Sequence, residues 1–357
     1  MRNSAPQLNN EIIGLVESLT NASGISGGEG EVRSIVVSQI KSHVDNHHVD
    51  ALGNVLALRK GEGKDALRVM LSAHMDEVGG MILDIDQDGF HYFDVIGKVD
   101  KRQLIGKSVL VGTDHLPGVI GCKPIHLTKP HEMRQPVEIN DLRIDLSPEG
   151  SGKAHPGDRI SFSTRFTRNG AVMLAKALDD RLGVAILIDL VKHAPENIEL
   201  LAAFTVQEEI GLRGARVAAY ALNPQLAIAL DATNANEMPA WDDSENIYYN
   251  SKIGHGPVIY VADGATICDP RLVRHAITIA ERLGIPYQLR QPGTGGTDAG
   301  AIHKSRSGIP SLTISIPIRN IHTPISITHI DDFGNTIWLV KEMLASLDRS
   351  LLTSERA

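Results

Sequence analysis

The chain of 357 residues has few cysteines and no long apolar stretch. Its two cysteines, Cys122 and Cys268, are too few for a disulfide framework and too far apart for a CxxC metal site. This usage fits a reduced, intracellular setting. No apolar run approaches the roughly 18 residues of a membrane span, and the first residues lack the apolar core of a signal peptide. We therefore expect a soluble, cytoplasmic protein with no membrane partner.

Positive charge and aromatic side chains are also scarce. A net charge of −8 argues against a general attraction to nucleic acid. Aromatic residues make up 4% of the chain and leave few rings to stack on sugars. Hydrophobic residues at 42% and charged residues at 22% are typical of a globular protein. Because 357 residues exceed the size at which one core keeps growing, we expect a large domain and a smaller one.

The pattern of apolar residues changes twice along the chain. Helical and strand patterns alternate up to residue 80 and again from residue 167, whereas residues 81–166 form short, turn-rich, alternating segments. The predicted fold class is α/β, with a mixed, mostly parallel sheet sandwiched by helices in residues 1–80 and 167–357. Residues 81–166 are predicted to form an inserted, small, all-β domain like a barrel. Its loop 123–136 holds three prolines and is expected to be exposed.

The same patterns place individual elements within the α/β part. Helices are predicted at residues 8–20, 29–42, 180–193, 212–222, 271–283 and 331–347, and strands at 54–59, 66–73, 199–206, 226–230, 287–290 and 311–316.

Two polar clusters stand where predicted strands and helices meet. His74 and Asp76 follow an apolar strand, an arrangement in which an imidazole can bind a metal while a carboxylate orients it. A histidine at a strand end is, taken alone, more often structural. Asp179 and Asp180 precede an apolar helix, and capping of that helix accounts for Asp180 but not for two adjacent acids. Asp179 could therefore bridge two cations.

Three further clusters complete the set. Glu208 and Glu209 end an apolar strand, and because neighbouring acids repel each other they call for a cation. Strand alternation would send their side chains in different directions. Asp231 ends the next strand, where an acid is often only a turn former. His322 follows the last strand directly and is preferred to His329, which is interpreted as a residue of the surface or behind the site.

Two histidines with several carboxylates favour a hydrolytic metal centre. Mixed His, Asp and Glu ligands suit zinc, cobalt or manganese, and the absence of thiolates argues against a structural zinc site. Two such ions about 3.5–4 Å apart can share a hydroxide, with one carboxylate left free as the base. The adjacent Glu208 and Glu209 offer a liganded and an unliganded carboxylate.

Six motifs occur in order along the chain: HMDEVGG (74–80), LDDR (178–181), EE followed by Gly (208–211), LDAT (230–233), GGTDAG (295–300) and IHTP (321–324). This set resembles the M42 family of dinuclear metalloaminopeptidases, which includes glutamyl, deblocking and tetrahedral aminopeptidases. The resemblance covers nearly the whole chain, and six ordered motifs are far more specific than any one of them.

The resemblance implies a ligand set for two divalent ions per subunit, zinc or cobalt first and manganese next. His74, Asp179 and Asp231 would bind one ion, and Asp179, Glu209 and His322 would bind the other. None of the expected ligand types is replaced in this sequence.

The resemblance also implies a reaction. The enzyme would hydrolyse N-terminal residues from peptides with a free N-terminus through a hydroxide that bridges the two metals. Glu208 would be the general base and Asp76 would orient His74, while Asp179–Asp180 would be a cis peptide. Residues 293–300 are interpreted as a flexible loop near the substrate pocket, although a plain turn explains them equally well.

Assembly is a further implication of the resemblance. The inserted domain at 81–166 would mediate dimerisation, and dimers would build a hollow tetrahedral dodecamer that admits only peptides. From the residues alone, this module is a β domain with an exposed loop.

Two other functions compete with an aminopeptidase. Related cocatalytic carboxypeptidases and deacylases usually carry their second domain later in the chain, whereas here the insertion lies between Asp76 and Asp179. This order favours an aminopeptidase. A peptide-binding or scaffold protein with the same fold would show no turnover with zinc or cobalt.

A glycosidase, such as an endoglucanase, is the third alternative. Its pair of carboxyls could be Glu208 with Asp76 or Asp231. A glycosidase has no use for His74 and His322 at strand boundaries, so we regard this function as the least favoured.

Overall fold

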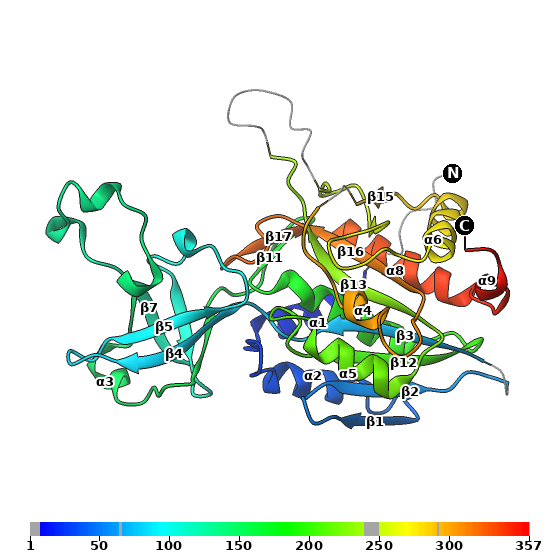
Figure 1. The fold of residues 1–357 in the computed structure, drawn as a ribbon, viewed down its shortest axis with the longest axis horizontal. Coiled ribbons are helices and arrows are strands. Elements are labelled where there is room, and N and C mark those ends of the chain that lie inside the picture. The colour runs from blue at the N-terminus through cyan, green and yellow to red at the C-terminus, as the bar shows by residue number, and fades with distance from the viewer. Residues whose placement is uncertain (1–7, 64–65, 239–249, 291–292, 357) are drawn as a thin grey trace.

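The computed structural model describes residues 8–63, 66–238, 250–290 and 293–356. These residues form a large α/β body and a smaller lobe of β-strands beside it (Figure 1). The chain enters the lobe after β3 (Leu67–His74) and returns to the body after β9 (Arg159–Phe162).

The body is built on one eight-stranded sheet, whose strands run in the order β1-β2-β12-β3-β13-β16-β14-β15. The central strands β12, β3, β13 and β16 are mutually parallel, while β2 and β14 run antiparallel to their central neighbours. Parallel strands covered on both faces need nearly continuous apolar sequences, as in the buried run of β3. The remaining bounds are β1 (Asn46–Val49), β2 (Val55–Arg59), β12 (Ile198–Thr205), β13 (Leu226–Asn234), β14 (Val258–Ile259), β15 (Gln288–Leu289) and β16 (Ser311–Ile318).

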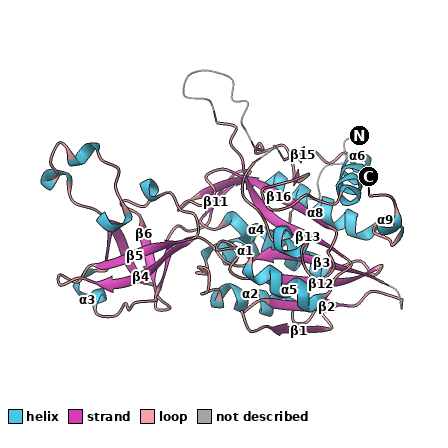
Figure 2. Cartoon of the chain, in the orientation of Figure 1, coloured by secondary structure: helices cyan, strands magenta, loops and turns pink. Residues whose placement is uncertain are grey.

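Helices cover both faces of this sheet (Figure 2). The thicker layer surrounds α4 (Leu178–Lys192), which is apolar on nearly all sides and buried along most of its length. The thinner layer consists of α5 (Arg213–Leu222) and α7 (Ala299–Ile302), packed over a separate apolar cluster. The other helices of the body are α1 (Asn10–Asn21), α2 (Gly30–Ile40), α6 (Pro270–Leu283), α8 (Ile330–Ala345) and α9 (Ser350–Thr353).

The lobe is a closed barrel in the order β4-β5-β8-β7-β6-β9, with an apolar core of its own. The first strand of the barrel begins at Gly79. A glycine is required there because a Cβ would lie 2.4 Å from the carbonyl oxygen of Ile160 on β9. A long loop between β7 and β8 extends away from the body (Figure 1). The bounds are β4 (Gly79–Ile85), β5 (His91–Ile96), β6 (Ser108–Val111), β7 (Leu116–Gly121), β8 (Arg143–Asp145) and α3 (Ser147–Ser151), with 3-10 turns at Lys101–Gln103, Ile125–Leu127, Glu132–Arg134 and Ile139–Asp141.

A small sheet in the order β10-β11-β17 lies between the α/β body and the barrel. Its strands are β10 (Thr167–Asn169), β11 (Val172–Ala175) and β17 (Ser326–His329). Because β17 pairs with β11, the chain between β16 and β17 is held close to the start of α4. This sheet was absent from the sequence-based prediction.

The predicted α/β class, the mostly parallel sheet and the small barrel-like sheet are confirmed. The strand expected at 226–230 is too short, because β13 continues to Asn234. It loses its pairing with β3 after Ala229 but keeps its pairing with β16. Asp231 therefore lies inside the strand and not after its end.

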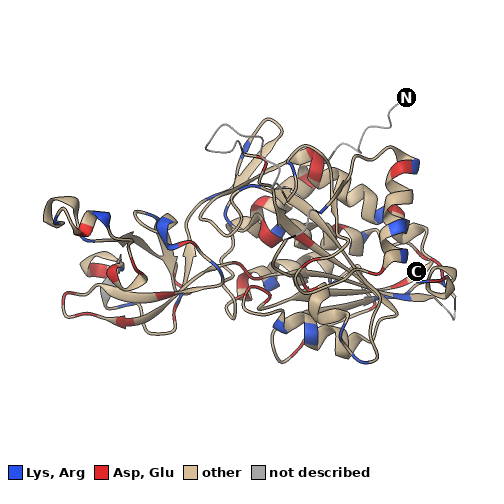
Figure 3. Cartoon of the chain, turned by 45° about the horizontal axis from the view of Figure 1, so that its top comes forward, with Lys and Arg blue, Asp and Glu red and all other residues tan. Residues whose placement is uncertain are grey.

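Charged residues are spread over both the body and the barrel, and basic (blue) and acidic (red) segments are interspersed in the view of Figure 3. Within the described part of the chain, no helix combines the length and the apolar character needed to span a bilayer.

Candidate metal centre

The predicted site residues come together at the carboxyl ends of the central strands, where α/β sheets form their binding crevices. His74 is the last residue of β3, and Asp179 lies at the start of α4. Glu209 follows β12, Asp231 lies in β13, and His322 lies between β16 and β17. Five segments far apart in the sequence thus supply one cluster.

Asp179 stands at the centre of this cluster. Its Oδ1 lies 3.3 Å from Nε2 of His74, and its Oδ2 lies 3.3 Å from Nε2 of His322. Asp231 Oδ1 lies 3.8 Å from the same nitrogen of His74, and Glu209 Oε2 lies 3.3 Å from that of His322. One carboxylate therefore faces two imidazoles, and each imidazole faces a further acid.

The cluster has the donors that a metal centre needs. His74, Asp179 and Asp231 form one group, and Asp179, Glu209 and His322 form another, with ligand atoms within 4.8 Å of one another in each. The buried Oδ1 of Asp179 has no hydrogen-bond partner among the described residues. An orphaned carboxylate oxygen between such donors is what a divalent cation would satisfy, so the residues fit metal ions.

Burial gives the acids of the site unusual proton affinities. It raises the pKa of Glu209 to about 7 and the pKa values of Glu208 and Asp231 well above their ordinary range, and repulsion among the acids adds to this. Burial also acts on Asp179, but the imidazoles of His322 and His74 outweigh it and lower the pKa of this carboxyl. A bound cation would relieve the repulsion among these acids.

The pKa values of the two histidines are raised as well, although burial acts on them in the opposite direction. Burial alone would lower their pKa values, yet the carboxylates of Asp179 and Asp76 hold the pKa of His74 well above its ordinary value. In the same way, Asp179 and Glu209 outweigh burial and raise the pKa of His322 to about 9. The acids and histidines of the site are thus strongly interacting.

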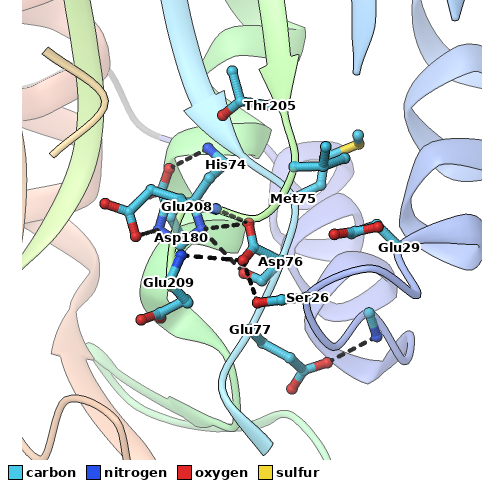
Figure 4. A network of polar contacts seen from close by, with 12 residues as sticks. Ser26, Glu29, His74, Met75, Asp76, Glu77, Asp180, Thr205, Glu208 and Glu209 are labelled. Carbon is cyan, nitrogen blue, oxygen red and sulfur yellow. Dashed lines mark hydrogen bonds and ion pairs between the residues drawn. The ribbon is translucent and has the colours of Figure 1, made fainter. Parts of the chain in front are cut away.

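Asp76 faces both His74 and the backbone that carries the two glutamates (Figure 4). Its backbone carbonyl oxygen lies 3.1 Å from Nδ1 of His74, whereas its nearest carboxylate oxygen lies 3.5 Å from that nitrogen. The carboxylate also accepts hydrogen bonds from the backbone N–H of Glu208 at 2.9 Å, from that of Glu209 at 3.2 Å and from Ser26 Oγ at 2.6 Å. Asp76 therefore anchors the chain that carries both glutamates.

The expectation that strand alternation separates Glu208 from Glu209 is wrong. Strand β12 ends at Thr205, where its pairing with β3 stops, so both glutamates lie in the loop that follows. Val206 N–H donates to the side chain of Asn54 instead of continuing the strand, and Gln207 has a positive φ of 57°. The directions of the Glu208 and Glu209 side chains are therefore set by this turn and not by the alternation of side chains along a strand.

Asp180 supports the start of α4. Its Oδ1 accepts a hydrogen bond from Gly183 N–H at 3.0 Å, which confirms the capping interpretation, and its Oδ2 accepts one from His74 N–H at 3.2 Å. The peptide bond between Asp179 and Asp180 is cis, as the resemblance implied. His329 caps α8 by accepting a hydrogen bond from Asp331 N–H at 3.2 Å.

Sequence reasoning missed a buried ion cluster behind the site. Both carboxylate oxygens of Glu77 accept hydrogen bonds from Lys176 Nζ, at 2.7 and 2.9 Å, and Arg181 Nη2 lies 3.2 Å from one of them. Burial lowers the pKa of Lys176 to about 8. The three residues belong to motifs already singled out, HMDEVGG and the stretch around LDDR, so proximity to those motifs was the available signal.

Asp298, from the GGTDAG motif, is a second buried acid that the prediction did not assign. Its Oδ2 accepts a hydrogen bond from Thr205 Oγ1 at 2.6 Å, which joins α7 to the end of β12. Burial raises the pKa of Asp298 to about 6.

A cavity of about 570 Å³ opens beside the carboxylates. The loop 293–300 contributes Thr294 to Thr297 to its wall, while Pro292 before it lies outside the described residues. Two hollows of similar size, over α1 and α4 and between α5 and α7, contain none of the predicted ligands. The rest of the wall includes Lys98, Leu212, Thr233, Asn250, Tyr260, Ala265, Arg290 and Ile321.

Comparison with known proteins gives consistent matches. The family model described as M42 glutamyl aminopeptidase matches residues 53–339. A lysyl aminopeptidase from Pyrococcus furiosus is 34% identical over 93% of this chain and 96% of its own. The structure of aminopeptidase APDkam598 from Desulfurococcus kamchatkensis is similar with a TM-score of 0.90 at 34% identity, covering 96% of this chain and 97% of that one. The TET1 peptidase of Pyrococcus horikoshii, which can assemble into a tetrahedron or a large octahedral shell, gives a TM-score of 0.81 at 33% identity, covering 94% and 100%.

Proposed function

Since the chain belongs to the M42 glutamyl aminopeptidase family, we propose that it is a metal-dependent aminopeptidase that releases N-terminal residues from peptides. The observation that carries this proposal is the position of Asp179 between two imidazoles, 3.3 Å from each, in a cluster of buried acids. Such an arrangement suits two cations that share one carboxylate.

The residues around Asp179 divide into two ligand sets. His74, Asp179 and Asp231 would hold one divalent ion, and Asp179, Glu209 and His322 would hold the other. Zinc, cobalt or manganese in these sites would act as a Lewis acid on the peptide carbonyl and lower the pKa of a coordinated water.

Glu208 is the proposed general base. Its Oε2 lies 4.0 Å from Nε2 of His74, beside the ligands, and its side chain lines the cavity. Burial raises the pKa of this carboxyl while nearby cations would lower it. A balance near neutrality suits a group that takes a proton from the attacking water and returns it to the leaving amine.

Asp76 is the proposed positioning residue for this base. Because it accepts hydrogen bonds from the N–H groups of Glu208 and Glu209, it fixes the loop that carries the base and a ligand together. Its carbonyl oxygen also faces Nδ1 of His74, which leaves Nε2 directed toward Asp179.

Assembly is part of the proposal. We divide the chain into a catalytic domain of residues 1–80 and 167–357 and a dimerisation domain of residues 81–166. The shell assembly of the similar TET1 peptidase supports self-association to dimers and a tetrahedral dodecamer. The long loop of the barrel carries exposed Ile125, Leu127 and Met133, which are suited to burial against a second subunit.

The test compares the protein before and after metal removal. The chelated protein should not cleave aminoacyl-p-nitroanilides, and Zn²⁺, Co²⁺ or Mn²⁺ should restore cleavage. A peptide blocked at its C-terminus should be shortened, whereas an N-acetylated peptide of the same sequence should stay intact. The reverse result would indicate a carboxypeptidase or deacylase, chelator-resistant cleavage of cellulose an endoglucanase, and no turnover under any condition a binding protein.

A further inference from the structure

We propose that the groove between α5 and α7 binds the part of a peptide substrate that follows the scissile bond, and that it favours acidic residues in that part. This inference rests on the proposed function, which brings the first residue and its carbonyl to the ligand cluster. It concerns a separate hollow of about 750 Å³, whose walls contain none of the proposed ligands.

The groove shares a wall with the cavity beside the ligand cluster. Gly211 and Leu212 line both hollows. They follow Glu208 and Glu209 in the same turn, so the shared wall is the next part of the chain after the proposed base. Gly211 is exposed, and a Cβ there would meet no atom within 4 Å, so the wall is low at this point.

The direction of the substrate follows from the role of Glu208. A general base that takes a proton from the attacking water returns it to the leaving amine, so the leaving nitrogen must lie beside this carboxylate. The residues that follow this nitrogen then leave the cavity on the side of the turn that carries Glu208. The groove between α5 and α7 is the hollow that adjoins this turn through Gly211 and Leu212.

The walls of the groove favour an anion. They include Arg216 on α5 and Lys304 and Arg306 after α7, and they include no carboxylate. This is a concentration of positive charge in a chain whose net charge is −8. The exposed side chains of Arg216 and Lys304 form no ion pair or hydrogen bond with any described residue. A carboxylate in the groove would therefore displace no existing partner.

The third cation is held in position without being neutralised. The guanidinium of Arg306 lies over the ring of Tyr220, 4.2 Å from its centroid, and its Nε donates to the carbonyl oxygen of Tyr220 at 2.9 Å. No carboxylate of the described residues pairs with it, so the remaining donors of its planar fork can bind one. Val217 and Tyr220 expose 40% and 63% of their surface and offer apolar contact to the rest of a peptide chain.

The length of the groove sets which substrate residues reach these cations. An α-helix rises about 1.5 Å per residue, so the stretch from Leu212 to Tyr220 spans roughly 12 Å. An extended peptide covers this distance with about four residues. An aminoacyl-p-nitroanilide has no chain to place in the groove, whereas a hexapeptide does.

The experiment uses the full-length, cobalt-loaded protein and three substrates with the same first residue, the one cleaved best as a p-nitroanilide. They are that p-nitroanilide, a hexapeptide amide with glutamate at its fourth and fifth positions, and the same hexapeptide with glutamine there. We expect the glutamate peptide to have a KM about threefold to tenfold lower at similar kcat, because this contact is the same in the ground state and the transition state. The difference should shrink in about 0.5 M NaCl.

Two double variants assign the effect to the groove. Arg216→Gln with Lys304→Gln should remove the difference in KM and leave cleavage of the p-nitroanilide unchanged. Lys41→Gln with Lys60→Gln is the matched control, because it removes two exposed cations outside the groove and should preserve the difference.

Three results would overturn the inference. These are equal KM values for the two hexapeptides in the wild type, a difference that persists in the groove variant, or a smaller particle mass of that variant by light scattering, which would make the groove a contact between copies of the chain. The wild-type comparison decides the question even if a variant does not fold. Failure of the metal-loaded protein to cleave any p-nitroanilide would instead reject the proposed function.

Discussion

Asp76 and Glu208 are joined by a hydrogen bond of 2.9 Å from the backbone N–H of the glutamate to the carboxylate of the aspartate. The other carboxylate oxygen accepts the N–H of Glu209 and the hydroxyl of Ser26. An acid expected to orient His74 thus also holds the turn that carries Glu208, the proposed base, and Glu209, a proposed ligand. Its replacement should disturb catalysis through the position of that turn.

Asp76→Asn is expected to lower kcat by roughly tenfold to a hundredfold, because an amide has one acceptor oxygen where the carboxylate has two. Metal content, measured by elemental analysis, should stay near that of the wild type. Ser26→Ala, which removes only one donor to this carboxylate, should have the smaller effect. A variant that loses metal before it loses turnover would show that Asp76 acts mainly through His74.

Glu208→Gln and Glu209→Gln should separate the roles of the two glutamates. The first should lose roughly a hundredfold to ten-thousandfold in kcat, as expected of a general base, while it keeps both metal ions. The second should lose one ion, because a ligand is weakened. Kinetics and metal analysis on the same samples provide the measurement, and equal metal content with equal activity in both variants would contradict the assignment.

Exposed apolar residues in the barrel loop should control assembly. Ile125, Leu127 and Met133 expose 73%, 60% and 57% of their surface, and we expect a triple serine variant to form smaller particles. Light scattering after size-exclusion chromatography measures the particle mass. Val49→Ser, at an apolar residue that exposes 48% of its surface on the edge strand β1 of the main sheet, should leave the mass unchanged. An unaltered mass in the triple variant would reject the loop as an interface.

Asp332 gives the folded state a pH dependence of known sign. Its carboxylate accepts the N–H groups of Gly254 and Gly256, and burial raises its pKa from 3.8 to about 6. Between these two values the folded state keeps a proton that the unfolded state has released, so the free energy of unfolding should fall as the pH rises from about 4 to 6. The decrease from this group is of the order of 3 kcal/mol.

Urea unfolding of the wild type and of Asp332→Asn across this pH range checks the expectation. The variant should lack this part of the slope, because an amide does not titrate. Parallel curves for the two proteins would mean that the pKa of Asp332 is not raised in the folded state.

The sequence predicts the strand and helix pattern well where burial dictates it. Strands β3 and β12 are apolar over their full length, so their periodicity and their ends can be read directly. The small sheet escaped prediction because β11 and β17 are short and pair across 150 residues or so, a contact that no local pattern encodes.

The site was predictable as a set of residues but not as a set of contacts. His74, Asp179 and His322 each lie beside an element boundary, and a common edge of the sheet brings them together. The hydrogen bonds that the N–H groups of Glu208 and Glu209 donate to Asp76 depend on where β12 stops pairing with β3. Only the tertiary structure decides that point. The same holds for Arg290, which follows a strand of two residues and whose guanidinium lies over the ring of Tyr260.

The segment from His74 to Gly79 has four tasks within six residues. It ends a central strand with His74, a proposed metal ligand, anchors the glutamate turn through Asp76, pairs with Lys176 through Glu77 and begins the barrel at Gly79. Each task fixes a position along the backbone, so inserting or deleting one residue here would put at least two of them out of register. We therefore expect the folded protein to tolerate insertions and deletions outside this segment, such as in the long loop of the barrel.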